Sequence, residues 1–310
     1  MPGLMRGAFL WASRNNWLRE RASRHKFVRR SVSRFMPGEQ VEDALAAARN
    51  LENQGLRTVL THLGENVSTA SEAESVAQHY LDALEHVRAA GLHSELSVKL
   101  THLSLDLGHE LCQAKIEEII QAAGNDSFVW IDMESSPYVD ATLAVYRNLR
   151  RTYSNVGVCL QAYLYRTAED LDSLLPMGPG IRLVKGAYLE TPKVAFPRKE
   201  DVDRNFFALA TKLLSKEALS AGVRTVIATH DLNLIHRIES LARSENLTRD
   251  DFQFQMLYGI QRAEQLRLAR DGWRSGVLIS YGTFWFPWYM RRLAERPANV
   301  GFVIRNLLGG

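Results

Sequence analysis

Beyond residue 40 the sequence alternates between two hydrophobic periods, and this alternation limits the possible folds more than any other feature. Eight short runs of apolar and β-branched residues are predicted to be strands: Arg57–Leu63, Leu96–Leu103, Phe128–Met133, Gly157–Leu164, Ile181–Ala187, Arg224–Ala228, Phe252–Tyr258 and Gly276–Tyr281. Segments with helical spacing separate them: Glu74–Ala90, Leu111–Ala123, Tyr138–Tyr153, Arg204–Ala221, Leu232–Arg243 and Arg262–Asp271. Strands separated by helices of this length imply parallel pairing through βαβ units.

Eight such units favour a (βα)8 barrel, in the α/β class, over an open doubly wound sheet. An open sheet of that kind more often carries a G-x-G-x-x-G turn, which this sequence lacks. The strand cores are almost continuously apolar, as expected where both faces of a strand are buried. We therefore predict a barrel domain at residues 41–310 after a basic helical segment at residues 1–40. The polar stretch Pro192–Asp203 is predicted to be a long loop after the fifth strand.

The composition excludes several classes of protein. Of the 310 residues, 46% are hydrophobic, so disorder is excluded and a large core can form. No apolar run reaches the ~18 residues that a membrane span requires. The two cysteines, Cys112 and Cys159, make neither a disulfide framework nor a zinc site, so we expect a reducing compartment and no metal centre.

The positive charge is concentrated at the start of the chain. Residues 1–36 contain nine Lys or Arg and one acid, Glu20, for a net charge of +8. Such a segment is compatible with a transit peptide, with a basic amphipathic helix on an anionic membrane surface, or with a solvated helix that caps the core. Binding to nucleic acid is not expected, because the basic run stops abruptly and no basic stripe recurs later.

Polar residues gather where seven of the predicted strands end. In chain order they are Lys99, Thr101, Asp132, Glu134, Gln161, Tyr163, Arg182, Lys185, Tyr188, Thr229, His230, Asp231, Tyr258 and Tyr281. In a barrel the catalytic groups come from the C-terminal ends of the strands. One such residue alone is equally compatible with a structural ion pair or a helix cap. Because burying unpaired charge is costly, polar groups from seven strands at one rim predict a functional site.

The segment 285–297 is predicted to be a short helix, with Pro287 in its first turn and Pro297 at its end. Its spacing places four side chains on one face: Trp288, Arg291, Arg292 and Glu295. Two adjacent Arg on a helix are able to hold a carboxylate through fork-shaped hydrogen bonds. Periodicity alone is equally compatible with an exposed Arg–Glu pair beside packed aromatic residues.

At this helix the sequence resembles the proline dehydrogenases, flavin-dependent enzymes that oxidise L-proline to Δ1-pyrroline-5-carboxylate. The family hallmark Tyr-x-x-Arg-Arg-x-x-Glu-Arg is matched by Arg291-Arg292-x-x-Glu295-Arg296, and a second hallmark by the run 182–188. Four shorter motifs follow the family order: 97–101, 161–163, 229–231 and 257–259. The match covers roughly residues 30–300 and is similar to the short monofunctional bacterial form.

The resemblance implies a distorted (βα)8 barrel with N-terminal helices and a final helix over the C-terminal mouth. It also implies FAD as cofactor, hydride transfer from C5 of L-proline to flavin N5, and a quinone as electron acceptor, in the first step of proline catabolism to glutamate. With no membrane-spanning run, the enzyme is expected in the cytoplasm, or in the mitochondrial matrix of a eukaryote. The N-terminal segment is then a candidate for peripheral contact with the inner face of the membrane.

The resemblance also assigns roles to individual residues. The substrate-binding residues would be Arg291, Arg292 and Lys99 around the carboxylate, with Leu257, Tyr281, Trp288 and Glu295 around the ring. Asp132 and Arg182 would be catalytic, with Asp132 beside the reacting centre and Arg182 near flavin N5. Besides Arg182, the FAD-binding residues would be Met133, Gln161, Val184, Lys185, Gly186, Ala187, Thr229 and His230.

One position departs from the family pattern, because Trp288 replaces the hallmark Tyr and the phenol is missing. The preference between proline and hydroxyproline is therefore less determined than the reaction type. Glu65 resembles a family Glu that pairs with a site Arg over the pocket. Two other hypotheses remain: a Schiff-base barrel enzyme that uses Lys99 or Lys185, and a barrel that binds amino acids or a membrane without catalysis.

Overall fold

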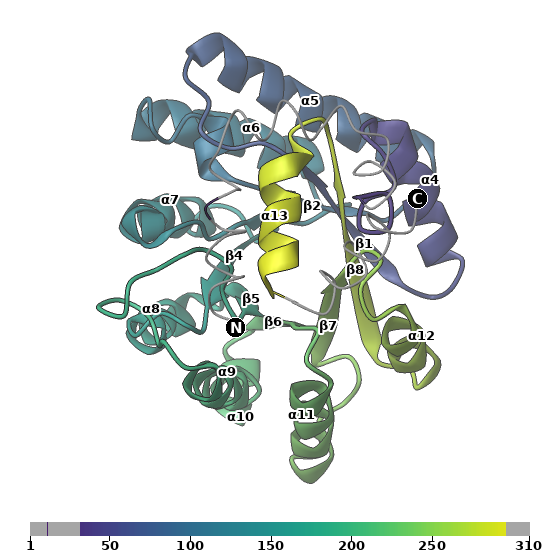
Figure 1. Ribbon diagram of the computed structural model, residues 1–310, viewed down its shortest axis with the longest axis vertical. Helices are drawn as coiled ribbons and strands as arrows, with labels where there is room; N and C mark the ends of the chain where they lie inside the picture. Colours follow the sequence, from purple (N-terminus) through teal and green to yellow (C-terminus); the bar gives the residue numbers. More distant parts are fainter. Residues whose placement is uncertain (1–10, 12–31, 296–310) are drawn as a thin grey trace.

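Eight parallel strands close into a barrel in the computed structural model, which describes Trp11 and residues 32–295 (Figure 1). The strands are β1 Arg57–His62, β2 Glu95–Val98, β3 Val129–Ile131, β4 Val156–Gln161, β5 Gly180–Val184, β6 Arg224–Ala228, β7 Phe252–Leu257 and β8 Arg274–Tyr281. Each strand pairs with the next in the sequence, and β8 pairs with β1 from Arg57↔Gly276 to His62↔Tyr281. The predicted (βα)8 barrel is confirmed.

Helices surround the barrel, and the last one lies across its end (Figure 1). They are α4 Val41–Glu52, α5 Ala70–Ala89, α6 His109–Ala123, α7 Val139–Arg150, α8 Thr167–Leu174, α9 Lys199–Leu213, α10 Lys216–Ser220, α11 Leu232–Ser244, α12 Arg262–Arg270 and α13 Trp285–Glu295. Three 3₁₀ turns lie between strands and helices: η1 Leu100–Leu103, η2 Ser136–Tyr138 and η3 Leu175–Met177. Of the described helices, none is both long and apolar enough to cross a membrane.

The structure corrects several predicted boundaries. The predicted strand Leu96–Leu103 ends at Val98, and its second half is the buried turn η1, because a short apolar run does not distinguish a strand from a buried helical turn. The predicted loop Pro192–Asp203 ends early, since α9 begins at Lys199 with acidic residues in its first turn. The predicted helix Arg204–Ala221 is divided into α9 and α10. The eight-residue helix α8 was not predicted.

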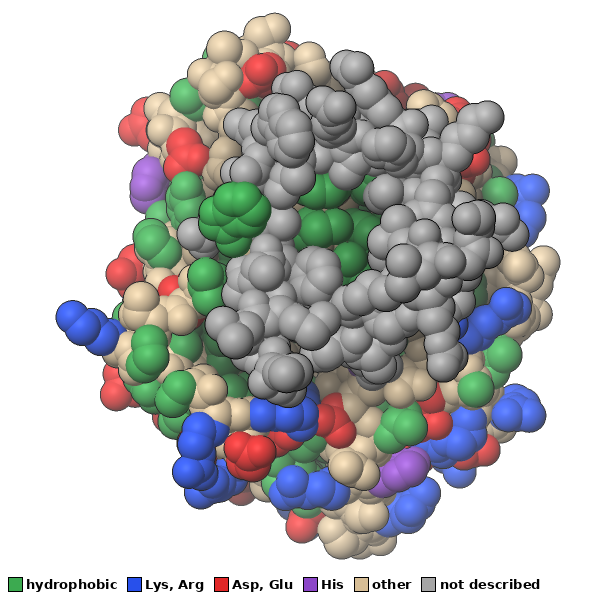
Figure 2. All heavy atoms as spheres, viewed as in Figure 1, with side chains coloured by type: hydrophobic (Ala, Val, Ile, Leu, Met, Phe, Trp, Pro, Cys, Tyr) green, Lys and Arg blue, Asp and Glu red, His purple; other side chains and the backbone are tan. Residues whose placement is uncertain are grey.

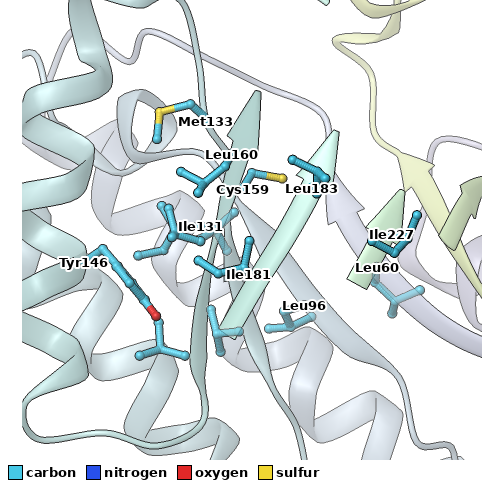
Figure 3. Packing of buried hydrophobic residues seen from close by; sticks show 14 of the residues in the cluster. Leu60, Leu96, Ile131, Met133, Tyr146, Cys159, Leu160, Ile181, Leu183 and Ile227 are labelled. Atoms are coloured by element: carbon cyan, nitrogen blue, oxygen red, sulfur yellow. The ribbon is translucent and has the colours of Figure 1, made fainter. Parts of the chain in front are cut away.

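The outer core lies between the strands and the surrounding helices. Figure 3 shows Tyr146 of α7 on the helix side of the sheet, in one cluster with Ile131 and Ile181. A smaller cluster inside the barrel contains Val59, Trp130 and Val226. Trp130 is large and fully buried, so it fills part of the interior, and a cavity lies nearer the C-terminal strand ends.

Residues 32–36 pack under the last helix, α13. Val32, Phe35 and Met36 form a buried cluster with the aromatic residues of α13, among them Trp285 and Tyr289. The remainder of the predicted segment 1–40, residues 1–10 and 12–31, lies outside the described residues. The domain division at residue 40 therefore stays a prediction.

The tight packing around Gly157 on β4 predicts the effect of a substitution. An added Cβ would lie 2.6 Å from Trp130 Cζ3 and 2.8 Å from Phe128 Cε1, both in packed rings. We expect Gly157→Ala to lower the free energy of unfolding by about 2 kcal/mol, since overpacked cores lose ~1–3 kcal/mol. Urea unfolding followed by circular dichroism measures the change. A midpoint equal to that of the parent protein would show that the interior is looser than described.

Candidate active site

A cavity of about 1000 Å³ opens at the C-terminal ends of the strands, beneath α13. In the view of Figure 2, hydrophobic side chains are visible at the centre of this face. Most of the predicted site residues line the cavity: Lys99, Asp132, Met133, Gln161, Arg182, Val184, Lys185, Gly186, Ala187, Thr229, His230, Leu257, Trp288, Arg291 and Arg292. The barrel thus brings together residues spread over nearly two hundred positions of sequence.

Asp132, just after β3, joins the charged groups at the floor of the cavity. Its carboxylate accepts hydrogen bonds from Ser97 Oγ at 2.8 Å and Lys99 Nζ at 3.0 Å, and it also forms an ion pair with Arg182. Burial raises the pKa of the Asp132 carboxyl, but Lys99 and Arg182 outweigh this effect and hold the pKa below its ordinary value. One carboxylate therefore stays ionised between two cations.

Arg182 on β5 is fully buried, and each of its nitrogens has a partner. Nε donates to Cys159 Sγ at 2.9 Å, Nη1 to Gln255 Oε1 at 3.3 Å, and Nη2 to Ser97 Oγ at 2.6 Å and to Asp132. Its Cζ lies 5.4 Å from the ring centroid of Trp130 below. These contacts fix the guanidinium against the strands.

The last helix supplies cations from the opposite side of the cavity. Arg291 Nη1 lies 3.2 Å from Glu65 Oε1, and Nη2 lies 3.4 Å from Glu65 Oε2. The same guanidinium lies 5.4 Å from the ring centroid of Tyr188, and that of Arg292 lies 5.9 Å from the ring of Trp288. Burial raises the pKa of Tyr188 well above its ordinary value, so the phenol stays neutral. The pairing inferred for Glu65 by resemblance is present.

Lys185, at the end of β5, is held by two carboxylates. It forms ion pairs with Asp203 of α9 and with Asp231, where its Nζ lies 2.7 Å from Oδ2. Lys199 contacts the same two carboxylates. Burial raises the pKa of Asp231, but Lys185 and Lys199 outweigh it and lower the value to about 2. The two lysines and the two aspartates together carry no net charge.

Gly186 has a structural reason to be glycine. Its φ is +114°, a region that side-chain-bearing residues rarely adopt, and an added Cβ would lie 2.3 Å from the ring of Tyr163. Gly186 also lines the cavity, and its predicted role in binding FAD stays a prediction. Nearby, the backbone N–H of Leu257 donates to His230 Nε2 at 2.9 Å, so that nitrogen carries no proton.

Three buried polar atoms of cavity-lining residues lack a hydrogen-bond partner within the described part of the chain. They are Thr61 Oγ1, Gln255 Nε2 and Ser280 Oγ. Buried polar groups without partners are rare in native proteins.

One predicted substrate residue, Tyr281, is not brought to the cavity, and the side chain of a second, Glu295, lies outside what the structure describes. Leu278 and Ser280 line it, so the pleat of β8 turns Tyr281 outward, where its hydroxyl lies 2.9 Å from His79 Nε2. The prediction that Tyr281 borders the substrate ring is therefore not met. Glu295 lies in the last turn of α13, but the position of its side chain lies outside what the structure describes.

Three site residues were missed by the sequence interpretation, although a usable signal existed. Ser97 and Cys159 precede the predicted residues Lys99 and Gln161 by two positions, and Gln255 precedes Leu257 by two. Residues i and i+2 of a strand share one face. Extending each motif back by two residues would have identified the partners of Arg182.

A possible cation site lies away from this cavity. His236, Glu239 and Glu264 place potential ligand atoms within 4.8 Å of one another. Arg267 already forms ion pairs with both carboxylates, at 2.8 Å to Glu239 and 2.6 Å to Glu264. The guanidinium thus supplies the positive charge that these acids require.

Comparison with known proteins identifies the family. A family model described as proline dehydrogenase matches residues 44–305. The chain is 38% identical over 306 residues to proline dehydrogenase 1 of Bacillus subtilis (strain 168), covering 98% of this chain and 99% of that protein. It is 37% identical over 285 residues to a proline dehydrogenase of Deinococcus radiodurans, covering 90% of each.

Solved structures agree on the fold. Proline utilization A from Bdellovibrio bacteriovorus, inactivated by N-propargylglycine, superposes with a TM-score of 0.79 at 22% identity, over 86% of this chain and 33% of that one. The corresponding protein from Corynebacterium freiburgense gives a TM-score of 0.76 over 93% of this chain and 34% of that one. This chain spans about a third of those proteins. The family match and the full-length relatives show that the chain belongs to the proline dehydrogenase family, oxidoreductases of proline metabolism.

Proposed function

We propose that this protein oxidises L-proline to Δ1-pyrroline-5-carboxylate with FAD as cofactor. The observation that carries the proposal is the arrangement of charge in one cavity: Lys99, Asp132 and Arg182 on the barrel floor face Arg291 and Arg292 on α13. The four cations of this set outnumber its two carboxylates, Asp132 and Glu65. The set therefore favours an anionic substrate. An amino acid of proline's size matches this chemistry.

Substrate orientation follows from the positions of the cations. Arg291, Arg292 and Lys99 all line the cavity, from its two opposite sides, and are proposed to hold the proline carboxylate. Leu257 and the ring of Trp288 supply apolar surface for the pyrrolidine. Fixing the carboxylate on one side presents the C5–H bond toward the floor, which lowers the entropic part of the barrier.

The cavity also fits a dinucleotide cofactor. Its volume of about 1000 Å³ exceeds what proline requires, and Gln255 and Ser280 add polar side chains to its wall. The remaining candidates from the resemblance line the same wall: Met133, Gln161, Val184, Lys185, Gly186, Ala187, Thr229 and His230. When bound, FAD would supply the hydride acceptor.

The buried Arg182 is proposed to stabilise negative charge that develops beside it during the reaction. Its side chain is fixed by Cys159, Gln255 and Ser97, so little reorganisation is required. Asp132 offsets part of the charge of Lys99 and Arg182 and keeps the two cations in place. Both residues thus act through prearranged electrostatics.

The Schiff-base hypothesis is disfavoured by the state of the two candidate lysines. A Schiff-base lysine requires a neutral amine. Lys99 Nζ is instead held in an ion pair with Asp132, and Lys185 Nζ in ion pairs with Asp203 and Asp231, so both nitrogens are already engaged by carboxylates.

Electrons that leave the flavin are proposed to pass to a membrane quinone, with the protein in the cytoplasm or the mitochondrial matrix. The net charge of +8 in residues 1–36 supports contact with an anionic surface. Deleting residues 1–30 should then reduce pelleting with vesicles that contain anionic lipid.

The proposed reaction predicts a spectroscopic result. The purified protein should show flavin absorption bands, and anaerobic L-proline should bleach them. A flavin that stays oxidised would indicate another substrate. A colourless protein that takes up no added FAD would refute the proposed function.

The position of Trp288 in the cavity leads to a prediction about which substrates the enzyme accepts. Its indole lines the cavity and fills space beside Arg292. We expect Trp288→Ala to raise the ratio of kcat/KM for hydroxyproline to that for proline about tenfold, because the pocket then admits the added hydroxyl. Trp285→Ala is the control, since Trp285 packs in the same helix away from the cavity. An unchanged ratio in Trp288→Ala would place the ring of proline elsewhere.

Asp132 predicts a stability change with a defined pH dependence. Asp132→Asn should lower the free energy of unfolding at pH 7 by about 3 kcal/mol, because two buried cations lose their counter-ion. Since the folded-state pKa is depressed, this stabilisation is present above the unfolded-state pKa and is lost as pH falls through the folded-state value. The difference should therefore shrink below about pH 4.

Urea unfolding between pH 3 and pH 8 measures this difference. The matched control is Asp126→Asn, because Asp126 is an exposed acid 3.8 Å from Arg88. Exposed pairs contribute ~0–1 kcal/mol, so the control should change little. A difference for Asp132→Asn that is the same at all pH values would show that its charge is not the cause.

A further inference from the structure

A buried carboxyl group behind the cavity has no part in the reaction proposed above. Glu134 follows β3 and is 3% exposed. Its Oε1 accepts from the backbone N–H of Thr101 at 3.1 Å, and its Oε2 accepts from the Thr101 hydroxyl at 2.7 Å. Glu134 therefore holds the turn η1, which follows Lys99.

The same turn supports the loop after β1. The backbone N–H of Asn66 donates to Thr101 Oγ1 at 3.2 Å, and that of Val67 donates to the Thr101 carbonyl at 3.2 Å. Gly64 packs so closely on the turn that an added Cβ would lie 2.0 Å from His102 Nε2. Contacts at Gly64, Asn66 and Val67 thus fix this loop to η1.

This loop carries Glu65, the ion-pair partner of Arg291. Asn66 has a φ of +56°, so the residue next to Glu65 is held in a left-handed conformation. The side chains of Arg291 and Glu65 are 12% and 17% exposed. A guanidinium this buried depends on its counter-ion for its position.

We propose that Thr101 and Glu134 are positioning residues for Arg291. The Glu134 carboxylate orients the Thr101 hydroxyl, the hydroxyl and carbonyl of Thr101 fix residues 64–67, and Glu65 on that loop holds the guanidinium over the cavity. The inference rests on the proposed function only where Arg291 is taken to bind the substrate carboxylate.

We call the contacts from Glu134 through Thr101 and Glu65 to Arg291 the relay. The protonation state of Glu134 decides how strongly the relay holds Arg291. An ionised carboxylate only accepts, so the hydroxyl proton of Thr101 points to Glu134 and a lone pair of Oγ1 faces the N–H of Asn66. Protonated Glu134 becomes a competing donor, and the contact loses the strength of a charge-assisted bond.

The surroundings of Glu134 place its titration within the working range of an enzyme. Burial raises the pKa to about 7, against the opposing effects of Thr101 and Lys99. The charged and titratable groups that face Glu134 are Lys99, Glu65, Arg291, Tyr138, Tyr188 and Cys112. Of these, Glu65 raises and Lys99 lowers the pKa of Glu134.

A double-mutant cycle on the FAD-loaded, full-length enzyme tests the relay. Thr101→Val should raise KM for L-proline about tenfold with a much smaller change in kcat, because it removes binding that is equal in ground state and transition state. Thr101→Ser keeps the hydroxyl and should restore KM to within about twofold of the parent value.

Coupling to Glu65 distinguishes positioning from a general loss of structure. Glu65→Ala should raise KM by a similar factor, and Thr101→Val in that background should add little, since both act through the same contact. Effects that multiply in the double variant, to about a hundredfold, would overturn the proposal. So would a Thr101→Val protein with parental KM.

Glu134→Gln provides a second readout if Thr101→Val does not fold. The ratio of its KM to that of the parent enzyme should be near one at pH 6 and rise to about tenfold at pH 8.5, because only the parent gains a carboxylate. Taking the ratio cancels the titration of the proline amine. A ratio independent of pH would overturn the proposal. Failure of the parent enzyme to oxidise proline would instead refute the proposed function.

Discussion

The carboxylate of Asp132, shared by Lys99 and Arg182, is the interaction on which the rest of the site depends. Arg182 is almost fully buried, and in a barrel interior such a charge is tolerated only with a counter-ion and satisfied hydrogen bonds. Asp132 supplies the charge, and Ser97 bridges both partners. These groups come from β2, β3 and β5, so the pairing of β2 with β3 and, through β4, with β5 brings them together.

The helix α13, which carries the arginines of the site, is held by residues near position 35. Trp285 and Tyr289 of α13 pack on Val32 and Phe35, so the helix that carries Arg291 and Arg292 is fixed by residues more than two hundred positions earlier. The loop that carries Glu65 joins this helix to the barrel through one ion pair. We infer that substrate affinity is set as much by this loop and its support on Thr101 as by the arginines themselves.

Ion pairs lie at both ends of the cavity. Near α13 Arg291 is paired with Glu65, whereas at the other end Lys185 and Lys199 share Asp203 and Asp231. A phosphate that approaches Lys185 has to compete with two carboxylates already in place. For the proposed FAD, this competition would make affinity depend on the N-terminal part of α9, which carries both Lys199 and Asp203.

The sequence by itself determined the barrel, the strand order and the place of most predicted site residues in the cavity, because alternating hydrophobic periods and strand-end polar residues are local patterns. The proline dehydrogenase family also followed from its motifs, and the comparisons confirmed it. Only the tertiary structure decided which face each residue presents: Tyr281 points outward because the pleat of β8 turns Leu278 and Ser280 inward. It also decided the pairings of Lys185 and the support of Glu65 by Thr101, since these contacts join residues far apart in the chain and leave no periodic trace in the sequence.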